Sequence, residues 1–482
     1  MSLSQSAVEG VRWTTLSMLV VTTAQILQLI VLGRILGPDA FGLLAMIMVI
    51  TGFAQLIGQM GLSEAIIQHP HPTHIELSSL YWLNIVLGVF LYVILFLIAP
   101  LIATLYSTPE LKQLLPWVAL VFFISPWGIQ FNALLQKGLL FKPLAVIDVI
   151  AVVSGTLSAI ILALYGYGVW SLVWGQLIQS VVTMGLLVFV GWQRQMLPGF
   201  YFKYSATKPY LSFGLHLVGS NLLNYCNCRV DQLIIGVLLG SRALGYYSMA
   251  FNLVLQPVSR INPVLTKVAF PVLSRVRSDK ARLKRGYFRM LDLLTSINAP
   301  MLIGVAAIAP LMISVVLGSQ WLPIVPLIQV LAVFSLIRST GNAGGSLVLA
   351  CGRADLSLYW NLSLFAFIPL VICVGAKLAG LKGVAWALLG LQISLLFAWY
   401  YFVVRKLLGN CFYGFVSSMG APVIFAVPMA VVVTWVAPLL KTLPDTIQLT
   451  LQILSGVLTY ITFYILFRKE FVKEQIRLFL GT

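Results

Sequence analysis

The stretch SSLYWLNIVLGVFLYVILFLIAP, residues 78–100, carries no charged side chain. About twenty apolar residues in a helix are enough to cross the hydrocarbon of a bilayer. Similar runs recur along the chain of 482 residues, which is 60% hydrophobic and 9% charged, with a mean hydropathy of +0.99. A soluble protein carries about 25% charged residues. The sequence therefore predicts an all-α integral membrane protein.

The spacing of these runs predicts about fourteen transmembrane helices. They fall near residues 13–33, 40–60, 78–100, 113–136, 144–165, 168–192, 211–239, 243–266, 287–317, 322–350, 356–379, 382–404, 418–440 and 447–467. The first of them is interpreted as a span rather than a cleaved signal. Connectors of at most about twenty residues leave no room for a soluble catalytic domain. No nucleotide-binding or nucleophile motif appears either, so the sequence does not predict an enzyme.

An internal repeat indicates how the chain is organised. GRILGPDAFG at 33–42 recurs in outline as GVLLGSRALG at 236–245, 203 residues later. The repeat predicts two six-helix lobes, a common transporter plan with the substrate path at the lobe interface. The predicted parts are listed in chain order: an N-lobe at 1–192, a cytoplasmic linker at 193–209, a C-lobe at 210–405, and a C-terminal helix pair with a cytoplasmic tail at 406–482.

The net charge of +17 has a simple explanation in the topology. If the N-terminus is cytoplasmic, about 22 of the 30 Lys and Arg residues fall on the cytoplasmic side. This bias predicts a multi-pass protein with both termini in the cytoplasm. Because the cations lie between apolar runs and no nucleic-acid motif accompanies them, nucleic acid is not an expected partner.

The predicted helix at 211–239 carries a long polar stripe. At about 100° per residue its members lie within an arc of about 80°. They are His216, Ser220, Asn224, Asn227 and Asp231. Such groups are costly in hydrocarbon, so the stripe should face a lobe interface or a water-filled cavity. We take His216, Asn224 and Asn227 as candidate substrate contacts. Asp231 could be a structural anchor between helices, a cation-coupling group or a substrate contact, and Arg229 on the other side is a weaker candidate for an anion contact.

The predicted first helix repeats this pattern with Thr14, Ser17, Gln25 and Gln28 on one face. Amides and hydroxyls suit sugar hydroxyl groups as hydrogen-bond partners. We therefore take Gln25 and Gln28 as candidate substrate contacts. Polar packing between helices is the competing interpretation.

The predicted helix at 322–350 places Ser335, Arg338 and Asn342 on one face. An arginine in a span needs water, a carboxylate or a phosphate, and its guanidinium can bind a diphosphate or an acidic sugar with two hydrogen bonds. We interpret these residues as substrate-binding, with structural pairing of Arg338 as the alternative. Asp148 and Asp292 are further candidates, beside Asp231, for coupling to a proton or cation.

Other chemistry is not indicated. The five cysteines are expected to be buried thiols, and the histidine-rich loop at 68–74 a solvated turn, so no metal site and no cofactor are predicted. The basic, amphipathic run at 270–289 and the tail at 468–480 are interpreted as interfacial helices that touch anionic lipids. The run at 270–289 could also gather a diphosphate headgroup.

Several segments, in their order and spacing, are similar to one known family. They are GRILGPDAFG at 33–42, GLSEAIIQ at 61–68, LYWLN at 80–84, GYGVWSLV at 166–173, the run from Asp231 to Gly245, FPVLSR at 270–275, and GRAD at 352–355. The chain resembles Wzx-type polysaccharide flippases of the MOP (multidrug/oligosaccharidyl-lipid/polysaccharide) exporter superfamily, in a branch similar to the colanic acid exporter type. Arg229 is not a hallmark of that family.

The resemblance implies a V-shaped, two-lobed transporter of fourteen helices in the bacterial inner membrane. It implies outward movement of undecaprenyl-diphosphate-linked oligosaccharide units by alternating access, a basic lumen, and coupling to a proton or sodium gradient. A polysaccharide polymerase and a chain-length regulator would be possible partners. A drug or cation antiporter of the same superfamily is one alternative, and a membrane-embedded polysaccharide polymerase or ligase is another.

Overall fold

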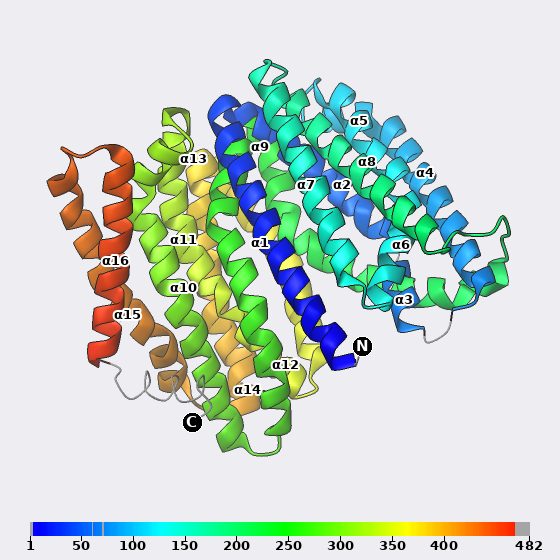
Figure 1. Cartoon of the computed structure of the whole chain (residues 1–482). Helices are drawn as coiled ribbons and strands as arrows, with labels where there is room; N and C mark the ends of the chain where they lie inside the picture. Colours follow the sequence, from blue (N-terminus) through cyan, green and yellow to red (C-terminus); the bar gives the residue numbers. More distant parts are fainter. Residues whose placement is uncertain (1–2, 60, 70–71, 468–482) are drawn as a thin grey trace. The chain divides into compact units, whose positions relative to one another are not determined.

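The computed structural model describes residues 3–59, 61–69 and 72–467, which form helices joined by short turns, with no β-strand among them (Figure 1). The first helices are α1 (Leu3–Ile35), α2 (Pro38–Gln59), α3 (Leu62–Gln68), α4 (His74–Leu105), α5 (Leu111–Ile124), α6 (Pro126–Lys137), α7 (Phe141–Leu164), α8 (Val169–Gln193) and α9 (Tyr204–Arg275). They are followed by α10 (Lys280–Val316), η1 (Ser319–Ile324), α11 (Val325–Ser339), α12 (Gly341–Ala350), α13 (Ala354–Trp399), η2 (Tyr400–Val404), α14 (Arg405–Leu408), α15 (Phe412–Val436), η3 (Ala437–Leu440) and α16 (Asp445–Phe467). The prediction of an all-helical membrane protein is confirmed.

The number of membrane passes depends on two very long helices. In the part of the chain that the structure describes, eleven helices are long and apolar enough to span, and the bent pair of α5 and α6 raises this to twelve. The stretches Asn224–Arg275 and Asp355–Leu408, of 52 and 54 residues, would each be about 80 Å long if straight. Hydrocarbon is about 30 Å thick, and both stretches break at a glycine with positive φ, 83° at Gly240 and 56° at Gly380. Each is therefore two passes, and the count comes to about fourteen.

Contacts divide the chain into two compact units, residues 1–245 and 246–482. In the first unit, small residues let α7 and α8 approach closely. A Cβ on Gly155 would lie 2.8 Å from the carbonyl oxygen of Gly175, and a Cβ on Gly175 would lie 2.6 Å from the Cβ of Ala159. Small residues of this kind are how helices pack tightly in lipid, where no hydrophobic force drives association.

Two glycines of the sequence repeat touch each other inside the first unit. A Cβ on Gly42 would lie 1.8 Å from the carbonyl oxygen of Ser241, and a Cβ on Gly245 would lie 1.9 Å from that of Pro38. The Ser241 hydroxyl also donates to the Asp39 carboxylate at 3.3 Å. The repeat motif is therefore a backbone-to-backbone contact between α2 and α9, and no side chain larger than hydrogen fits at either glycine.

The second unit is organised around α10, against which the C-terminal helices α15 and α16 pack. Tyr460 on α16 donates its hydroxyl to the backbone carbonyl of Ser296 at 2.8 Å, and Tyr464 donates to the Ser296 hydroxyl at 3.2 Å. The two tyrosines thus fasten the C-terminal helix pair to the rest of the unit.

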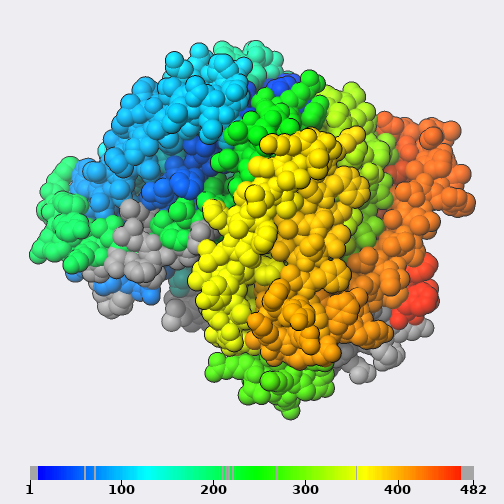
Figure 2. All heavy atoms as spheres, turned by 180° about the vertical axis from the view of Figure 1, so that it is seen from behind, coloured from blue at the N-terminus to red at the C-terminus, as the bar shows by residue number. Residues whose placement is uncertain are grey.

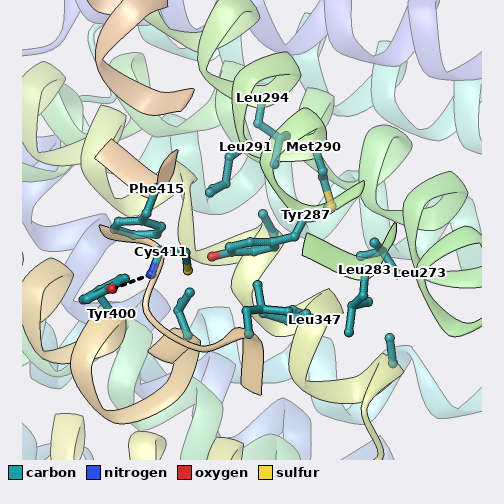
Figure 3. Packing of buried hydrophobic residues seen from close by; sticks show 14 residues of the cluster. Leu273, Leu283, Tyr287, Met290, Leu291, Leu294, Leu347, Tyr400, Cys411 and Phe415 are labelled. Atoms are coloured by element: carbon teal, nitrogen blue, oxygen red, sulfur yellow. Dashed lines mark hydrogen bonds between the residues drawn. The ribbon is translucent and has the colours of Figure 1, made fainter. Parts of the chain in front are cut away.

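One end of the second unit holds a large apolar cluster (Figure 3). Tyr287 of α10 lies at its centre, between Leu347 of α12 and Cys411 just before α15, and the Tyr400 hydroxyl accepts the backbone N–H of Cys411 at 3.0 Å. Leu273 at the end of α9 belongs to the same cluster. The cluster fixes the paired ends of α9 and α10, which form the lowest ribbon in Figure 1.

The interpretation of 270–289 as one interfacial helix is wrong. The structure ends α9 at Arg275 and starts α10 at Lys280. Asp279 causes the break because its carboxylate accepts the backbone N–H groups of Ala281 and Arg282, at 2.9 and 3.1 Å, and so caps α10. The N–H of Arg282, with that of Ala281 and the Arg282 guanidinium, holds the pKa of Asp279 below its ordinary value.

The connector predicted at 193–209 is shorter in the structure. Helix α8 continues to Gln193 and α9 begins at Tyr204, so the non-helical linker is 194–203. The predicted tail helix at 468–480 lies outside the described residues.

Candidate functional site

Asp148 is the most unusual carboxylate of the first unit. Viewed along α7, the exposed residues Val146, Ile150 and Leu157 share one side, and Asp148 lies about 180° away from them. Its neighbours on that opposite side, including Gly155, are buried, yet Asp148 is exposed. Among the described residues its side chain has no hydrogen bond or ion pair. A carboxylate in a spanning helix needs water or a partner, so we expect water to reach Asp148 on this side of α7.

The predicted stripe on α1 separates into two kinds of residue. Gln28 accepts a hydrogen bond from the Thr156 hydroxyl of α7 at 3.1 Å, and Ser17 is buried. Thr14 and Gln25 are exposed. Gln28 therefore joins α1 to α7, as the competing interpretation held, whereas Thr14 and Gln25 are not covered by other helices.

The first half of α9 mixes bonded and exposed side chains. Asn224 is exposed, Asn227 and Arg229 are half-buried, and Asp231 is 7% exposed. The Arg229 guanidinium donates to the Gln232 side-chain oxygen at 3.0 Å, and the Gln232 backbone N–H donates to the Asp231 carboxylate at 2.8 Å. The two charged residues thus do not face each other, as the sequence analysis held, and both have local partners.

The same stripe also includes His216 and Ser220. His216 lies in helical backbone, but its side chain, like that of Ser220, is outside the described residues. Between this region and α2, Tyr225 donates its hydroxyl toward the backbone carbonyls of Met48 and Val49, at 3.2 and 3.0 Å. That contact ties the first half of α9 to the first unit.

In the second unit, the candidates of the predicted helix at 322–350 lie on either side of a helix break. Arg338 is in the last turn of α11, half-buried, with its guanidinium 5.8 Å from the ring centre of Phe334. Ser335 is buried, whereas Asn342 of α12 is exposed. Asp292 of α10 is 7% exposed. Burial therefore makes Asn342 the most accessible of these residues.

The structure adds a polar stripe that the sequence analysis did not identify. Gln256, Ser259, Arg260 and Lys267 are all exposed, and on a helix they lie within an arc of about 100°. All four belong to the second half of α9, within the stretch Asn224–Arg275, which is long and apolar enough to cross a membrane. The sequence analysis counted Arg260 and Lys267 only among the cytoplasmic cations, although its predicted span at 243–266 contains Gln256, Ser259 and Arg260. The sequence did contain a signal for this stripe. Ser259, Arg260 and Lys267 follow Gln256 by three, four and eleven residues, which is the spacing of residues on one side of a helix.

The other side of the same helix segment carries a buried amide cluster. Asn262 donates to the backbone carbonyl of Ser339 at 3.4 Å and accepts from the Asn298 side-chain amide at 2.9 Å. Both asparagines are fully buried. These bonds link α9, α10 and α11, so they hold the second unit together at a level where lipid could not satisfy the amides.

Metal chemistry has no support in the described part of the chain, where no group of three or more His, Cys, Asp or Glu residues could hold an ion. Charged and amide side chains exposed on spanning helices are instead the hallmark of a membrane transporter. The chain belongs to the polysaccharide biosynthesis protein family, because the sequence model of that family matches residues 31–326. The resemblance to Wzx-type flippases is thereby confirmed.

Two relatives illustrate the similarity. The lipopolysaccharide biosynthesis protein WzxC of Escherichia coli strain K12 is 31% identical over 433 residues, which cover 90% of this chain and 88% of the relative. The teichuronic acid biosynthesis protein TuaB of Bacillus subtilis strain 168 is 32% identical over 386 residues, 80% of each chain.

Solved structures share the fold. The lipid II flippase MurJ in an inward closed conformation matches with a TM-score of 0.74 at 15% identity, over 96% of this chain and 100% of that one. An inward-facing multidrug resistance transporter of the MATE family, in the MOP superfamily, matches with a TM-score of 0.60 at 16% identity, over 83% and 98%. At these identities the comparison concerns the fold alone, which is that of the MOP transporters.

Proposed function

We propose that this chain is a flippase that moves undecaprenyl-diphosphate-linked oligosaccharide units across the bacterial inner membrane by alternating access. The relatives are named for the synthesis of lipopolysaccharide and teichuronic acid, and another, ExoT of Rhizobium meliloti, is named a succinoglycan biosynthesis transport protein at 25% identity over 74% of this chain. The product served would be an exopolysaccharide, a capsule or an O-antigen. The role is that of a carrier, with no bond made or broken.

The exposed stripe on α9 is the observation that supports this function best. A guanidinium and an ammonium, at Arg260 and Lys267, lie on one side of a spanning helix together with the amide of Gln256. Charged side chains are costly in free energy within hydrocarbon, so this side of the helix should face water or a ligand. Arg260 can bind a diphosphate with two charge-assisted hydrogen bonds, while the amide suits a sugar hydroxyl. The stripe therefore has the chemistry of an acidic, glycan-bearing headgroup.

The predicted site residues divide by exposure. Asn342, Gln25 and Asn224 are exposed and remain candidates for substrate contact. Gln28 and Ser335 are more enclosed, and we assign them to packing. Arg338, Arg229 and Asn227, which are half-buried, remain weaker candidates.

For energy coupling we favour Asp148. It is the exposed carboxylate of the three that the sequence analysis proposed, since Asp231 and Asp292 are buried. An exposed carboxylate can exchange a proton or sodium ion with water without first opening the helix packing. The predicted orientation, with both termini cytoplasmic, and the possible polymerase and chain-length partners belong to this proposal as well.

The test is transport by purified protein in proteoliposomes, with a fluorescent polyprenyl-diphosphate oligosaccharide as substrate. Arg260→Ala should lower the initial rate of flipping by about tenfold or more, because one charge-assisted contact is lost. Arg277→Ala is the matched control. It removes an equally exposed cation from the turn between α9 and α10, outside the spanning stretches, and should change the rate by less than about twofold.

Wild-type protein that does not flip the lipid-linked substrate would refute the proposed function itself. Equal rates for Arg260→Ala and wild type would leave flipping intact but remove Arg260 from the substrate path.

A further inference from the structure

The linker between α8 and α9 is built onto α4 rather than hanging between helices. The Trp82 indole N–H donates to the carbonyl of Gly199 at 3.0 Å. The Ser78 hydroxyl accepts the Gly199 N–H at 2.8 Å, and the Ser79 hydroxyl accepts the Lys203 N–H at 3.0 Å. Three backbone groups of the linker are thus fixed by side chains within two turns of one helix.

The start of α4 is itself well ordered. Thr73 and Glu76 form a capping box, and the His74 ring lies 3.2 Å from the carbonyl oxygen of Leu197 in the linker. Gly199 completes the arrangement, because a Cβ there would lie 2.5 Å from the ring of Tyr201. The linker therefore has one conformation along α4.

The anchor points also set the depth of the linker. As a helix of 32 residues, α4 is about 48 Å long, whereas hydrocarbon is about 30 Å thick. The polar residues of α4 lie at its start, where His74 and Glu76 are, whereas its other end is apolar, so the excess should leave the first turns, from His74 to about Trp82, near the headgroups. Figure 2 shows the linker at the left edge of the molecule, beside α4, with its outer side uncovered.

The side chains on that outer side are aromatic. Phe200 is 90% exposed, and Trp192, Phe202 and Tyr204 are each more than half exposed. Aromatic rings are enriched where membrane meets water, because part of the ring is apolar and part tolerates a polar setting. Four such rings on a linker held by hydrogen bonds would be an unfavourable surface in plain water.

Cations accompany the rings. Arg194, Lys203 and Lys208 are exposed, and the sequence from 192 to 210 contains no Asp or Glu. The segment is therefore both aromatic and uniformly basic. Anionic headgroups attract such cations near the membrane surface, whereas a neutral lipid offers no matching net charge.

We propose that residues 192–208, which we call the aromatic linker, form a binding surface for anionic phospholipid headgroups. The rings insert at the level of the headgroups, and Arg194, Lys203 and Lys208 contact phosphate groups. Because the linker leads directly into α9, lipid binding there would hold the start of α9 at a fixed depth. This role goes beyond flipping and does not require the chain to be a flippase.

The test places an environment-sensitive fluorescent amino acid at position 202 in the full-length protein. The protein is reconstituted in nanodiscs of phosphatidylcholine, alone or with phosphatidylglycerol replacing part of it. We expect blue-shifted emission that is quenched by headgroup-labelled doxyl lipid, and stronger quenching with phosphatidylglycerol. Water-like emission that no labelled lipid quenches would overturn the proposal, and would instead point to solvent or a protein partner on this surface.

The charge contribution is tested with Lys203→Gln/Lys208→Gln. The phosphatidylglycerol content needed for half-maximal quenching should rise about fivefold for each cation removed. The matched control is Lys112→Gln/Lys441→Gln, two exposed lysines that the charge pattern places on the other side of the membrane. An equal shift in both double variants, or no dependence on phosphatidylglycerol in the wild type, would also overturn the proposal.

Discussion

The second half of α9 presents two polar regions that behave oppositely. One side bears the exposed stripe of Gln256, Ser259, Arg260 and Lys267. The other bears Asn262, which is fully buried and bonded to Asn298 and Ser339. Arg260 and Asn262 are only two positions apart along the chain. Polarity in a membrane helix therefore has two uses, and exposure rather than residue type distinguishes them.

The first unit shows the same division. Gln28 is bonded to Thr156 between α1 and α7, while Asp148 on α7 is exposed on the packed side of its helix. If exposed polar residues serve transport and hydrogen-bonded ones serve packing, substitutions of the exposed residues should change transport and leave stability nearly unchanged. Substitutions in the bonded group should do the reverse.

The largest effect is expected for a graded series at Arg260. Arg260→Lys should keep part of the transport rate, Arg260→Gln should lose about tenfold, and Arg260→Glu about a hundredfold, because repulsion of the diphosphate replaces attraction. Initial flipping rates in proteoliposomes measure the series. Thermal unfolding in detergent should shift little for all three variants. Equal rates for Gln and Glu would mean that charge at this position is not sensed.

The second prediction concerns the buried amides. Asn298→Ala leaves Asn262 without its side-chain partner, which should cost about 1–3 kcal/mol of stability. The measurement is the free energy of unfolding in detergent or bicelles, with the flipping rate per folded molecule as a second readout. That rate should stay within about twofold of wild type.

A double variant makes this prediction sharper. In Asn262→Leu/Asn298→Leu both partners become apolar, so no buried amide is left unsatisfied. The double variant should be more stable than the sum of its single changes predicts. Additive losses would show that the two amides act separately and that the cluster is not a unit.

The sequence predicted the helical membrane fold correctly for a physical reason. Apolar runs of spanning length and glycines at a constant interval are properties of the chain itself. The break at Gly240 was visible as the second copy of the motif. By contrast, the linker end at Tyr204 and the turn at Asp279 depend on local capping and helix extension, which displace boundaries by several residues.

The candidate site was harder to predict because periodicity shows which residues share a side but not what lies opposite. Gln25 and Gln28 belong to one predicted stripe, yet one is exposed and the other bonded to α7. Arg260 was missed because it was counted only as a cytoplasmic cation, although it lies inside the predicted span at 243–266. Nothing in the sequence ranked Asp148 above Asp231, since only packing reveals which carboxylate is buried.

The third prediction extends the comparison to the exposed carboxylate. Asp148→Asn should remove the acceleration of flipping by an imposed proton or sodium gradient, a loss of about tenfold if coupling supplies about 1.4 kcal/mol. Flipping without a gradient should persist. Asp231→Asn, at the buried carboxylate, should instead lower stability while the gradient response remains. A full gradient response in Asp148→Asn would contradict the assignment.

The smallest effect is expected where a single neutral hydrogen bond joins two helices. Gln28→Leu removes the acceptor of the Thr156 hydroxyl, which should cost about 0.5–1.5 kcal/mol of stability. The hydroxyl of a threonine in a helix can turn back to a carbonyl of the preceding turn, so the loss should fall at the low end of this range. Gln25→Leu, three residues earlier and exposed, is the matched control and should leave stability unchanged. A larger loss of stability for Gln25→Leu than for Gln28→Leu would contradict this prediction. The exposed residue would then be the one that the fold requires, and exposure would not distinguish ligand-contacting residues from helix-joining residues in this unit.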